Sequence, residues 1–376
     1  MIRTNVLIIG GGPAGATAAR ILAGNKIETT LVERDLSYAK PCGGGIPSTA
    51  FDELSIPENT VKKKINKIKI ISPSGEMINV ELNGGCLCIT ERGAFDAQLR
   101  QMAISQGASI IEGMFSRFEE TGKTITSVLT GKPTREEVRI KSDYVIAADG
   151  ITSRVASSLQ VPRPRAINTV SALMKSSGLD TCEFWFGTEH ASNFYSWVFP
   201  SEGYASIGTG STSPRDLTAF LDIFARRRFN TPLAELKEQE LLGKTRAFKM
   251  PEWSGTLFNR GNILFAGDAA GMVMPVLYEG IYYAMKSGEF AARALIDGKP
   301  DFYEKLWNSR FRTRFLLMRT IKQHLFRDNE NIEKWVLLHK RPDVQELAIK
   351  LWLNKKQGRS GILTSYIKMF RHFIKF

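Results

Sequence analysis

Three glycines near the N-terminus have the spacing of a phosphate-binding turn. Gly10, Gly12 and Gly15 follow the apolar run of residues 6–9 (VLII), which is typical of a buried parallel strand. Gly10 would allow the tight turn, Gly12 would let a diphosphate approach the backbone, and Gly15 would let helix and strand pack closely. A helix that begins here offers free N–H groups and its positive dipole end to phosphates. The pattern therefore predicts a βα unit that binds a dinucleotide.

An acidic residue completes this unit. Glu33 ends the expected second strand, 18 residues after Gly15, where a carboxylate can accept hydrogen bonds from an adenosine ribose. We expect Pro13, Ala14 and Arg34 to contact the same dinucleotide. The motif alone does not distinguish FAD from NAD.

A cysteine lies just beyond this unit, in KPCGGGIP, residues 40–47. Cys42 precedes three glycines and lies between two prolines. Glycines let a backbone approach another group closely. In the flavoprotein class that this chain resembles, described below, the loop at this position lies close to the flavin ring, so the resemblance implies that Gly43 and Gly44 lie against the cofactor.

The other cysteines and the histidines indicate neither a metal site nor a nucleophilic triad. Four cysteines are too few for a disulfide scaffold in 376 residues. Cys86-x-Cys88 has no second Cys/His pair at ligand spacing, and alternate residues of a strand explain it better. The four histidines are scattered. We expect no bound metal and a reduced, cytoplasmic protein.

Two later segments indicate whether the bound dinucleotide is FAD or NAD. Residues 143–150 (DYVIAADG) and 261–268 (GNILFAGD) each read as a buried strand that ends in an Asp-Gly or Gly-Asp pair. With the glycine turn, they resemble the FAD domain of the para-hydroxybenzoate hydroxylase class of flavoproteins. The resemblance implies FAD as the cofactor.

The same resemblance implies roles for individual residues. Asp268 would bind the ribityl chain, and a helix starting near Gly280 would direct its N-terminus at the flavin ring. Arg92, in TERGAFDAQLR, would contact the flavin; the alternative is a helix-capping or surface arginine. The residues expected to bind FAD are Gly10, Gly12, Pro13, Ala14, Gly15, Glu33, Arg34, Cys42, Gly43, Gly44, Arg92, Asp149, Gly267, Asp268, Gly280 and Ile281.

Three blocks in order carry a closer resemblance. PCGGG at 41–45, YSWVFP at 195–200 and YEGIYYAMKSG at 278–288 resemble the geranylgeranyl reductase family, and most closely its chlorophyll and bacteriochlorophyll branch. The resemblance covers nearly the whole chain. One departure, MPVLY at 274–278, leaves the lipid substrate open, because chlorin-type sequences carry smaller polar residues there.

The resemblance implies an FAD-dependent reductase that saturates isolated C=C bonds of a geranylgeranyl chain, on chlorophyll or bacteriochlorophyll or on geranylgeranyl diphosphate. An isolated alkene has no carbonyl to accept charge, so a proton must arrive before or with the hydride. Because an ordinary thiol carries its proton at neutral pH, Cys42 is our candidate donor; the alternatives are Glu279, a bound water, or a Cys42 that only packs against the flavin. Tyr195, Trp197 and Phe199 alternate along an expected strand and would line the isoprenoid site, unless they are plain core.

Other functions stay open at this point. The acceptor could be another isoprenoid lipid, such as an archaeal ether lipid or menaquinone. A flavin-dependent aromatic monooxygenase would share the fold, and a non-enzymatic prenyl carrier like the Rab GDP-dissociation inhibitors is a third alternative; the family blocks and the intact FAD motif argue against these two. The electron donor is expected to be NADPH or ferredoxin, and no second Rossmann motif for NADPH is present.

The sequence predicts an α/β (α+β) fold with three parts. A discontinuous Rossmann-like FAD-binding domain would comprise residues 1–64, 90–160 and 258–300. An antiparallel-sheet substrate domain would comprise 65–89 and 161–257, and a C-terminal helical segment would comprise 301–376.

The net charge of +13 is concentrated near the C-terminus. Residues 301–376 hold 17 Lys/Arg against 7 Asp/Glu, and basic amphipathic helices can lie in a membrane interface. We expect peripheral contact with an anionic membrane through 360–376, whereas 310–327 could equally pack on the sheet with its cations outward. No recognition motif supports nucleic-acid binding. No signal peptide or membrane-spanning run is apparent.

Overall fold

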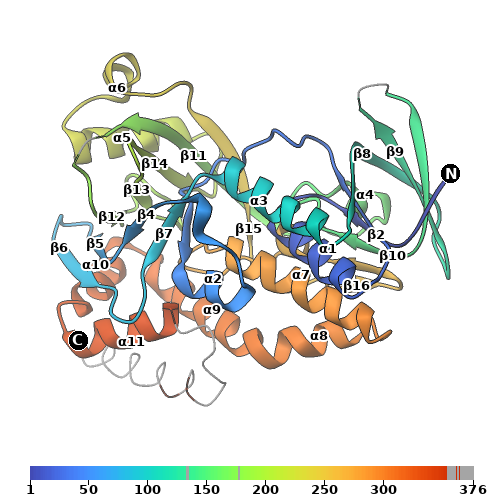
Figure 1. The fold of residues 1–376 in the computed structure, drawn as a ribbon. Coiled ribbons are helices and arrows are strands. Elements are labelled where there is room, and N and C mark those ends of the chain that lie inside the picture. Colours follow the sequence, from blue (N-terminus) through green and yellow to red (C-terminus); the bar gives the residue numbers. More distant parts are fainter. Residues whose placement is uncertain (133–134, 177, 354–360, 362–363, 365–376) are drawn as a thin grey trace. The chain divides into compact units, whose positions relative to one another are not determined.

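The computed structural model describes residues 1–376 apart from 133–134, 177, 354–360, 362–363 and 365–376 (Figure 1). The chain separates into two compact units. Unit 1 consists of Met1–Lys40, Gly93–Ala166 and Met250–Arg312, and unit 2 consists of Pro41–Arg92, Ile167–Lys249 and Thr313–Phe376. Each unit combines segments that are distant in sequence, so long-range contacts hold it together.

Unit 1 is built on a sheet with a parallel core. Its order is β1-β2-β8-β9-β10-β17-β16, with an additional pairing of β1 and β10. β1 pairs in parallel with β2 and β10, β2 with β8, and β10 with β17. Buried runs form the centre of this sheet, at residues 6–9 of β1, 29–32 of β2, 145–147 of β10 and 263–265 of β17, as parallel strands covered on both faces require. The strands are β1 Ile2–Ile9, β2 Thr29–Glu33, β8 Ser109–Glu120, β9 Ile125–Gly131, β10 Glu137–Ala147, β16 Asn259–Arg260 and β17 Ile263–Phe265.

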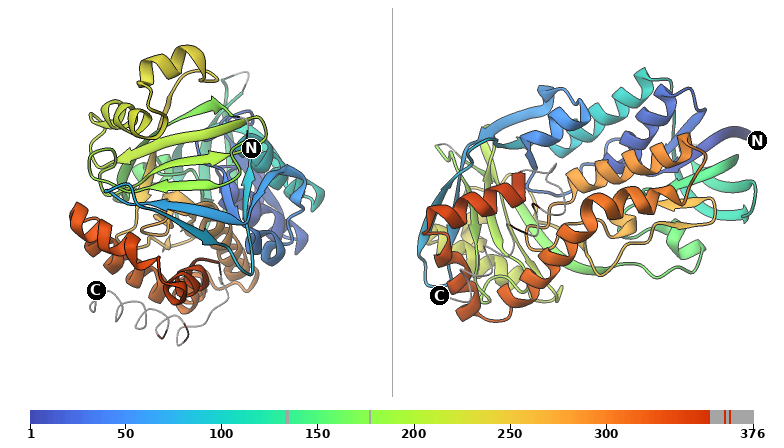
Figure 2. Two further views of the ribbon diagram at one scale, coloured as in Figure 1. Left: turned by 90° about the vertical axis from the view of Figure 1, so that its left-hand side faces the viewer. Right: turned by 90° about the horizontal axis from the view of Figure 1, so that it is seen from below.

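Two helices of unit 1, α1 and α7, lie side by side (Figure 2). Gly288 of α7 makes this approach possible, because a Cβ there would lie 2.1 Å from the Ala14 carbonyl oxygen of α1. The other helices are shorter or lie at the edges of the unit. The helical elements are α1 Pro13–Gly24, α3 Arg92–Ser105, α4 Arg154–Ser158, η2 Gly267–Ala270, α7 Ile281–Ile296, α8 Phe302–Trp307 and η3 Asn308–Arg312.

Unit 2 contains a large, mostly antiparallel sheet of order β15-β11-β14-β13-β12-β5-β6 and a small sheet of order β3-β7-β4. The α/β fold expected from the sequence is confirmed, with one difference. The difference concerns β7, which the sequence placed in the sheet of the substrate domain. β7 pairs instead with β4 and with β3, the short strand that directly follows the Cys42 loop. The strands are β3 Gly45–Pro47, β4 Val61–Ile65, β5 Lys67–Ile71, β6 Met77–Glu81, β7 Leu87–Thr90, β11 Arg165–Lys175, β12 Cys182–Trp185, β13 Ser196–Pro200, β14 Tyr204–Ser211 and β15 Arg246–Glu252.

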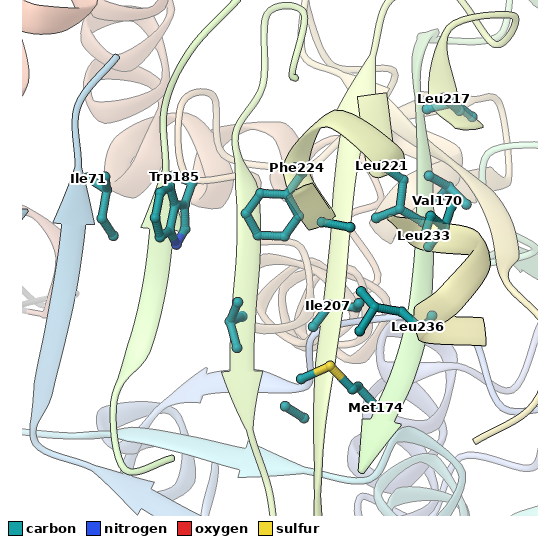
Figure 3. Packing of buried hydrophobic residues seen from close by; sticks show 14 residues of the cluster. Ile71, Val170, Met174, Trp185, Ile207, Leu217, Leu221, Phe224, Leu233 and Leu236 are labelled. Atoms are coloured by element: carbon teal, nitrogen blue, oxygen red, sulfur yellow. The ribbon is translucent and has the colours of Figure 1, made fainter. Parts of the chain in front are cut away.

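One face of the large sheet is covered by α5 (Leu217–Phe229) and α6 (Leu233–Gln239), as Figure 3 shows. Leu221 and Phe224 of α5 are fully buried against alternate sheet residues such as Val198 and Ile207. Side chains alternate across a strand, so the residues between them point to the opposite face. That opposite face includes Trp197 and Phe199.

The C-terminal helices of unit 2 bury two cations. Arg314 and Lys322 of α9 are 1% and 6% exposed, and the Arg314 guanidinium donates to the Leu351 carbonyl. The sequence left two alternatives for 310–327, membrane contact or packing on the sheet with the cations outward. Because two of its cations are buried, neither alternative describes the whole segment. The remaining helical elements are α2 Ser48–Leu54, η1 Glu58–Thr60, α9 Thr313–Leu325, α10 Asn329–Leu338 and α11 Pro342–Leu353. Most of the expected membrane segment, 360–376, lies outside the described residues. Among the helices that the structure describes, none combines the length and apolarity needed to cross a bilayer.

A buried histidine fixes the start of β13. His190 is fully buried and packs against Phe224, and its Nδ1 lies 2.8 Å from Ser196 Oγ. Ser196 in turn donates to Thr209 Oγ1 of β14 at 2.9 Å. Burial lowers the pKa of His190 from 6.5 to about 4, and the nearby Glu189 carboxylate offsets only part of this effect. The imidazole is therefore neutral in the folded chain.

This burial predicts a loss of stability on mild acidification. The folded chain binds its proton at His190 only near pH 4, whereas the unfolded chain binds it near 6.5, so protons favour unfolding as the pH falls between these values. Between about pH 7.5 and about pH 5, His190 should account for about 2 kcal/mol of lost unfolding free energy. Chemical denaturation of wild type and His190→Gln at both pH values checks this.

The Gln variant should show a shallower pH slope without abolishing it, since burial also lowers the pKa of His339. Identical slopes in the two proteins would contradict the assignment.

Candidate functional site

The glycine turn of unit 1 has the geometry that the sequence predicts. Gly10 has φ +106°, and a Cβ there would lie 2.3 Å from the Ala148 carbonyl oxygen. A Cβ at Gly15 would lie 1.9 Å from the Gly10 carbonyl oxygen, so strand and helix meet closely there. Gly12, which precedes Pro13 at the start of α1, has no heavy atom within 4 Å of a built Cβ. This open space at a helix N-terminus is where a diphosphate can approach.

Glu33 lies at the end of β2, directly under the turn. Its Oε2 accepts from the Gly11 N–H at 2.6 Å and its Oε1 from the Asp35 N–H at 3.1 Å. A carboxylate oxygen can accept more than one hydrogen bond, so ribose hydroxyls can still bind there. The neighbouring Arg34 is exposed and its guanidinium lies 5.5 Å from the Tyr38 ring centre.

Arg100 of α3 connects the glycine turn to the loop after β2, a role that sequence analysis did not predict. Its guanidinium donates to the Gly11 carbonyl at 3.2 Å and to the Leu36 carbonyl at 2.9 Å, although the residue is only 8% exposed. An arginine presents several donors in a fixed plane, so one side chain can fix both the turn and the loop after β2.

Asp268 lies on η2, beside the first residues of α7. Its Oδ1 lies 3.8 Å from the position of a Cβ on Gly280, the residue before α7. Gly267, with φ +62°, donates its N–H to Ser287 Oγ of α7 at 2.8 Å. The expected ribityl-binding carboxylate and the N-terminus of the helix from Ile281 therefore lie together in unit 1.

Lys40 forms an ion pair with Asp268 that sequence reasoning missed. The ammonium and Asp268 Oδ2 are 2.5 Å apart, and both side chains are largely buried. Lys40 is the first residue of the KPCGGGIP stretch, but only the fold shows that it meets a carboxylate 228 positions later. The pair offsets the negative charge of the carboxylate that we expect to bind the ribityl chain.

The residues that depart from the family pattern form a strained loop before α7. Val276 has φ +72° and Tyr278 has φ +49°. A β-branched residue at positive φ is a genuine outlier, and such strain is often found at functional sites. The Met274 N–H donates to the Glu279 carbonyl at 3.0 Å, which closes the loop. Glu279, the alternative acid, is thus held at the end of a constrained turn.

Asp149 follows β10 and caps α4. Its Oδ2 accepts from the N–H groups of Arg154 and Val155, at 2.7 and 3.1 Å. Its Oδ1 is buried and has no hydrogen-bond partner among the described residues. Burial raises the pKa of Asp149, although the hydrogen bonds from Ser153, Val155 and Arg154 oppose it. The open turn at Gly12 and this unsatisfied oxygen both fit a bound dinucleotide.

The Cys42 loop of unit 2 is fixed by backbone contacts. Gly44, with φ +78°, accepts from the Thr90 N–H at 2.9 Å, and a Cβ on Gly44 would lie 2.3 Å from the Thr90 carbonyl oxygen. The Gly44 N–H lies 3.3 Å from Cys42 Sγ, which orients the half-buried thiol. Arg92, two residues after Thr90, begins α3 and is 7% exposed.

Tyr195, Trp197 and Phe199 lie on one face of the large sheet, opposite α5 and α6. We call this set, with Phe184, the aromatic face. Pairing of Phe199 with Ser206 and of Trp197 with Gly208 fixes their direction. Gly208 leaves room for the indole, since a Cβ there would lie 2.3 Å from Trp197 Cζ2.

The Cys42 loop lies directly on this face. A Cβ at Gly43 would lie 2.4 Å from Phe199 Cδ2, so only glycine lets the backbone rest on the ring. Unit 2 therefore brings together the thiol loop and the aromatic strand, two segments that the sequence marked separately.

Phe184 belongs to the aromatic face and was not predicted. Its ring lies 5.1 Å from that of Phe199, 5.2 Å from that of Tyr195 and 6.3 Å from that of Trp352 on α11, all in edge-on arrangements. Phe184 alternates with Cys182 in the short run CEFW. That alternation was the available signal, but four residues are too few to reveal a face.

The cysteine pair Cys86 and Cys88 is not part of this site. Their sulfur atoms are 3.7 Å apart, as expected for alternate residues on one side of an extended chain. Burial, the largest cause, raises the pKa of Cys88 to about 12. Within the described ranges, no group of three or more His, Cys, Asp or Glu side chains is arranged to hold a metal ion.

The comparisons with known proteins agree with this geometry. Residues 3–297 match the family described as FAD binding domain. The chain is therefore a flavoprotein of the FAD-binding class, and the cofactor expected from the sequence is confirmed.

Individual relatives show to which family within this class of flavoproteins the chain belongs. The geranylgeranyl diphosphate reductase of Rhodobacter capsulatus is 30% identical over 95% of this chain and 93% of its own length. That of Synechocystis is 30% identical over 93% of this chain and 92% of its own length. A geranylgeranyl bacteriochlorophyll reductase-like protein of Thermoplasma acidophilum has the same fold, with a TM-score of 0.84 and 22% identity, covering 100% of this chain and 98% of its own. The chain belongs to the geranylgeranyl reductase family of flavin-dependent oxidoreductases.

The open space at Gly12 leads to a prediction about FAD binding. A methyl group at Gly12 meets no protein atom within 4 Å, so Gly12→Ala should change unfolding free energy by no more than about 1 kcal/mol. It should weaken FAD binding about tenfold to a hundredfold, because the methyl group displaces the diphosphate from charge-assisted hydrogen bonds. Flavin fluorescence titration of the apoprotein measures the affinity.

Gly122→Ala is the matched control, since a Cβ there is equally unobstructed but lies in the turn between β8 and β9. It should bind FAD like wild type. Equal affinities for the two variants would show that the diphosphate binds elsewhere.

Proposed function

We propose that the chain saturates isolated C=C bonds of a geranylgeranyl chain, using FAD as the hydride carrier. The observation that carries the proposal is the contact between the Cys42 loop and the aromatic face. It brings the loop that carries the thiol onto a row of apolar rings, which suits an isoprenoid and not a small polar aromatic acid. Relatives named geranylgeranyl diphosphate reductase support the same substrate class.

The chemistry divides between cofactor and chain. Bound FAD, once reduced, supplies the hydride. The chain has to hold the alkene, exclude water and deliver a proton to the CH carbon while positive charge develops at the tertiary carbon. Tyr195, Trp197 and Phe199 are 6–8% exposed, so they form a dry surface whose π-faces can stabilise that charge.

Cys42 is our proposed proton donor. The Gly44 N–H donates to its sulfur, so the S–H is left to point toward the substrate. Glu279, at the end of the strained loop, is the alternative acid. The Cys42 S–H bond would break as its proton adds to the CH carbon, and the hydride that reduced FAD supplies would add to the tertiary carbon. The π bond of the alkene is lost, FAD returns to its oxidised form, and the Cys42 thiolate takes up a proton again from solvent.

We propose that FAD is held by the glycine turn, Glu33, Asp149 and the elements around Asp268, with contributions from the Cys42 loop and Arg92. Gly12 would leave room for the diphosphate. Glu33 would accept hydrogen bonds from the adenosine ribose, and Asp268 would bind the ribityl chain. The functional division would follow that expected from the sequence, with 1–64, 90–160 and 258–300 for FAD, 65–89 and 161–257 for the substrate, and 301–376 as a helical segment.

We also propose which molecule carries the geranylgeranyl chain and which donor reduces the flavin. We favour a geranylgeranyl group on a chlorin or on a diphosphate, since relatives about 30% identical to this chain are named geranylgeranyl diphosphate reductase. A membrane lipid is the near alternative, because the digeranylgeranylglycerophospholipid reductase of Methanosarcina acetivorans is 27% identical over 81% of this chain. NADPH or ferredoxin would reduce the flavin, and the basic residues 360–376 would contact an anionic membrane.

Anaerobic turnover tests the reaction directly. Dithionite-reduced protein is incubated with geranylgeranyl diphosphate, a geranylgeranyl chlorin and menaquinone in detergent, and the products are analysed by mass spectrometry. A gain of about two mass units per reduced bond identifies the substrate. If none of these compounds gains mass while the protein holds reduced flavin, the proposed function is wrong.

Replacement of the thiol tests the proton donor. Cys42→Ala and Cys42→Ser should each lower turnover about a hundredfold or more, the usual contribution of a positioned acid. Both should retain FAD with an unchanged visible spectrum. Normal turnover in Cys42→Ala would remove Cys42 as donor, and a loss confined to Glu279→Gln would transfer the role to that carboxylate.

A further inference from the structure

A loop of unit 1 connects the two carboxylates that we propose to bind the two halves of FAD. Glu33 ends β2 under the glycine turn, where the adenosine ribose would bind. The loop of residues 34–40 follows, and its last residue, Lys40, forms an ion pair with Asp268, where the ribityl chain would bind. Both ends of the loop belong to unit 1. The chain therefore carries a cation from the adenosine end of the proposed cofactor site to its flavin end.

Hydrogen bonds fix the course of this loop. The Asp35 N–H donates to Glu33 Oε1 at 3.1 Å, and the Arg100 guanidinium donates to the Leu36 carbonyl at 2.9 Å. Ser37 donates its N–H and its hydroxyl to Asp35 Oδ1, at 3.0 and 2.7 Å. The cation at the end of the loop therefore extends from a backbone that is held in place.

The ion pair at the end of the loop is shielded from water. Lys40 Nζ lies 2.5 Å from Asp268 Oδ2, and the two side chains are 24% and 12% exposed. Salt and water screen partly buried charges less than exposed ones, so each charge acts over a longer distance here. The pair is neutral as a whole, whereas loss of either member leaves the other charge without its partner.

A second positive element lies close to the same carboxylate. Asp268 Oδ1 is 3.8 Å from the position of a Cβ on Gly280, the residue before α7. Gly280 has no side chain that could cap this helix, which is 16 residues long. The first N–H groups of α7 and its positive dipole end are therefore directed past Gly280. Asp268 thus has a positive group near each of its two oxygens.

This arrangement has a consequence for flavin chemistry. Reduction of a flavin adds negative charge to its ring, so nearby charges change the affinity for the reduced form more than the affinity for the oxidised form. An unbalanced carboxylate beside the ribityl chain would oppose reduction, and an unbalanced ammonium would favour it. At an effective dielectric constant of about 20, a unit charge about 12 Å away changes the equilibrium about tenfold.

We propose that Lys40 sets the reduction potential of bound FAD through Asp268. It is a positioning residue, which holds the carboxylate beside α7 and balances its charge. The inference rests on the proposed role of Asp268 in binding the ribityl chain, and it is independent of which isoprenoid is reduced. It requires that removal of the ammonium and removal of the carboxylate shift the potential in opposite directions.

Anaerobic reduction of the holoenzyme against a reference dye measures the potential. Lys40→Met should lower the ratio of reduced to oxidised FAD about tenfold at a given dye potential, which corresponds to about 30 mV for a two-electron couple. Asp268→Asn should raise this ratio about tenfold. Lys40→Met/Asp268→Asn restores the wild-type net charge and should lie within about threefold of wild type.

A variant that loses FAD on purification still gives the same quantity. Titration of its apoprotein with oxidised FAD and with dithionite-reduced FAD yields two affinities, and their ratio relative to wild type equals the shift in potential. Thermal unfolding of each variant verifies that it is folded.

Matched controls separate charge from structure. Lys40→Arg keeps the charge and should keep the wild-type potential. Lys299→Met removes an exposed lysine just beyond the C-terminal end of α7, the opposite end from Gly280, and should also have no effect. A merely structural role would shift the potentials of Lys40→Met and Asp268→Asn in the same direction or leave them unchanged. Either result would overturn the inference.

The flavin measurements need no isoprenoid, so they distinguish this inference from the proposed reaction. Opposite shifts in a protein that reduces none of the tested lipids would support the charge balance and contradict the reaction. An active reductase without opposite shifts would contradict the charge balance alone.

Discussion

The backbone of the Cys42 loop rests on an aromatic ring, and most of unit 2 serves to make that contact possible. Phe199 can support Gly43 only if β13 keeps its register with β14. The register is fixed on one side by the glycine that receives Trp197 and on the other by the buried network of His190, Ser196 and Thr209. A close-packed interior transmits such constraints because neighbouring side chains cannot give way independently. The position of the thiol is therefore a property of the whole sheet.

Short sequence patterns were enough to predict the parts of the site in which neighbouring residues determine both the backbone geometry and the chemistry. The turn at Gly10, the end of β2 at Glu33 and the start of α7 after Gly280 are each determined by residues close together in sequence. The alternation of Tyr195, Trp197 and Phe199 likewise predicted that they share one face. The fold class followed from these elements and from the family resemblance, and the comparisons confirm it.

The parts that escaped prediction depend on contacts between distant segments. Lys40 meets Asp268, and Arg100 reaches back to Gly11, across separations that no local pattern encodes. Phe184 lies in a strand too short to show its periodicity. The charge distribution was the least reliable guide to structure, because the excess of cations near the C-terminus predicted a charged surface. Arg314 instead lies in the interior and donates to a backbone carbonyl there.

A reductase of isolated C=C bonds has to keep water away from the reacting alkene, since water would compete for developing positive charge. A sheet suits this requirement, because one of its faces can be buried along a row of paired residues. In unit 2, α5 and α6 cover the opposite face, and the Cys42 loop lies on the aromatic face, where Gly43 contacts Phe199. The proposed reaction therefore belongs on the aromatic face.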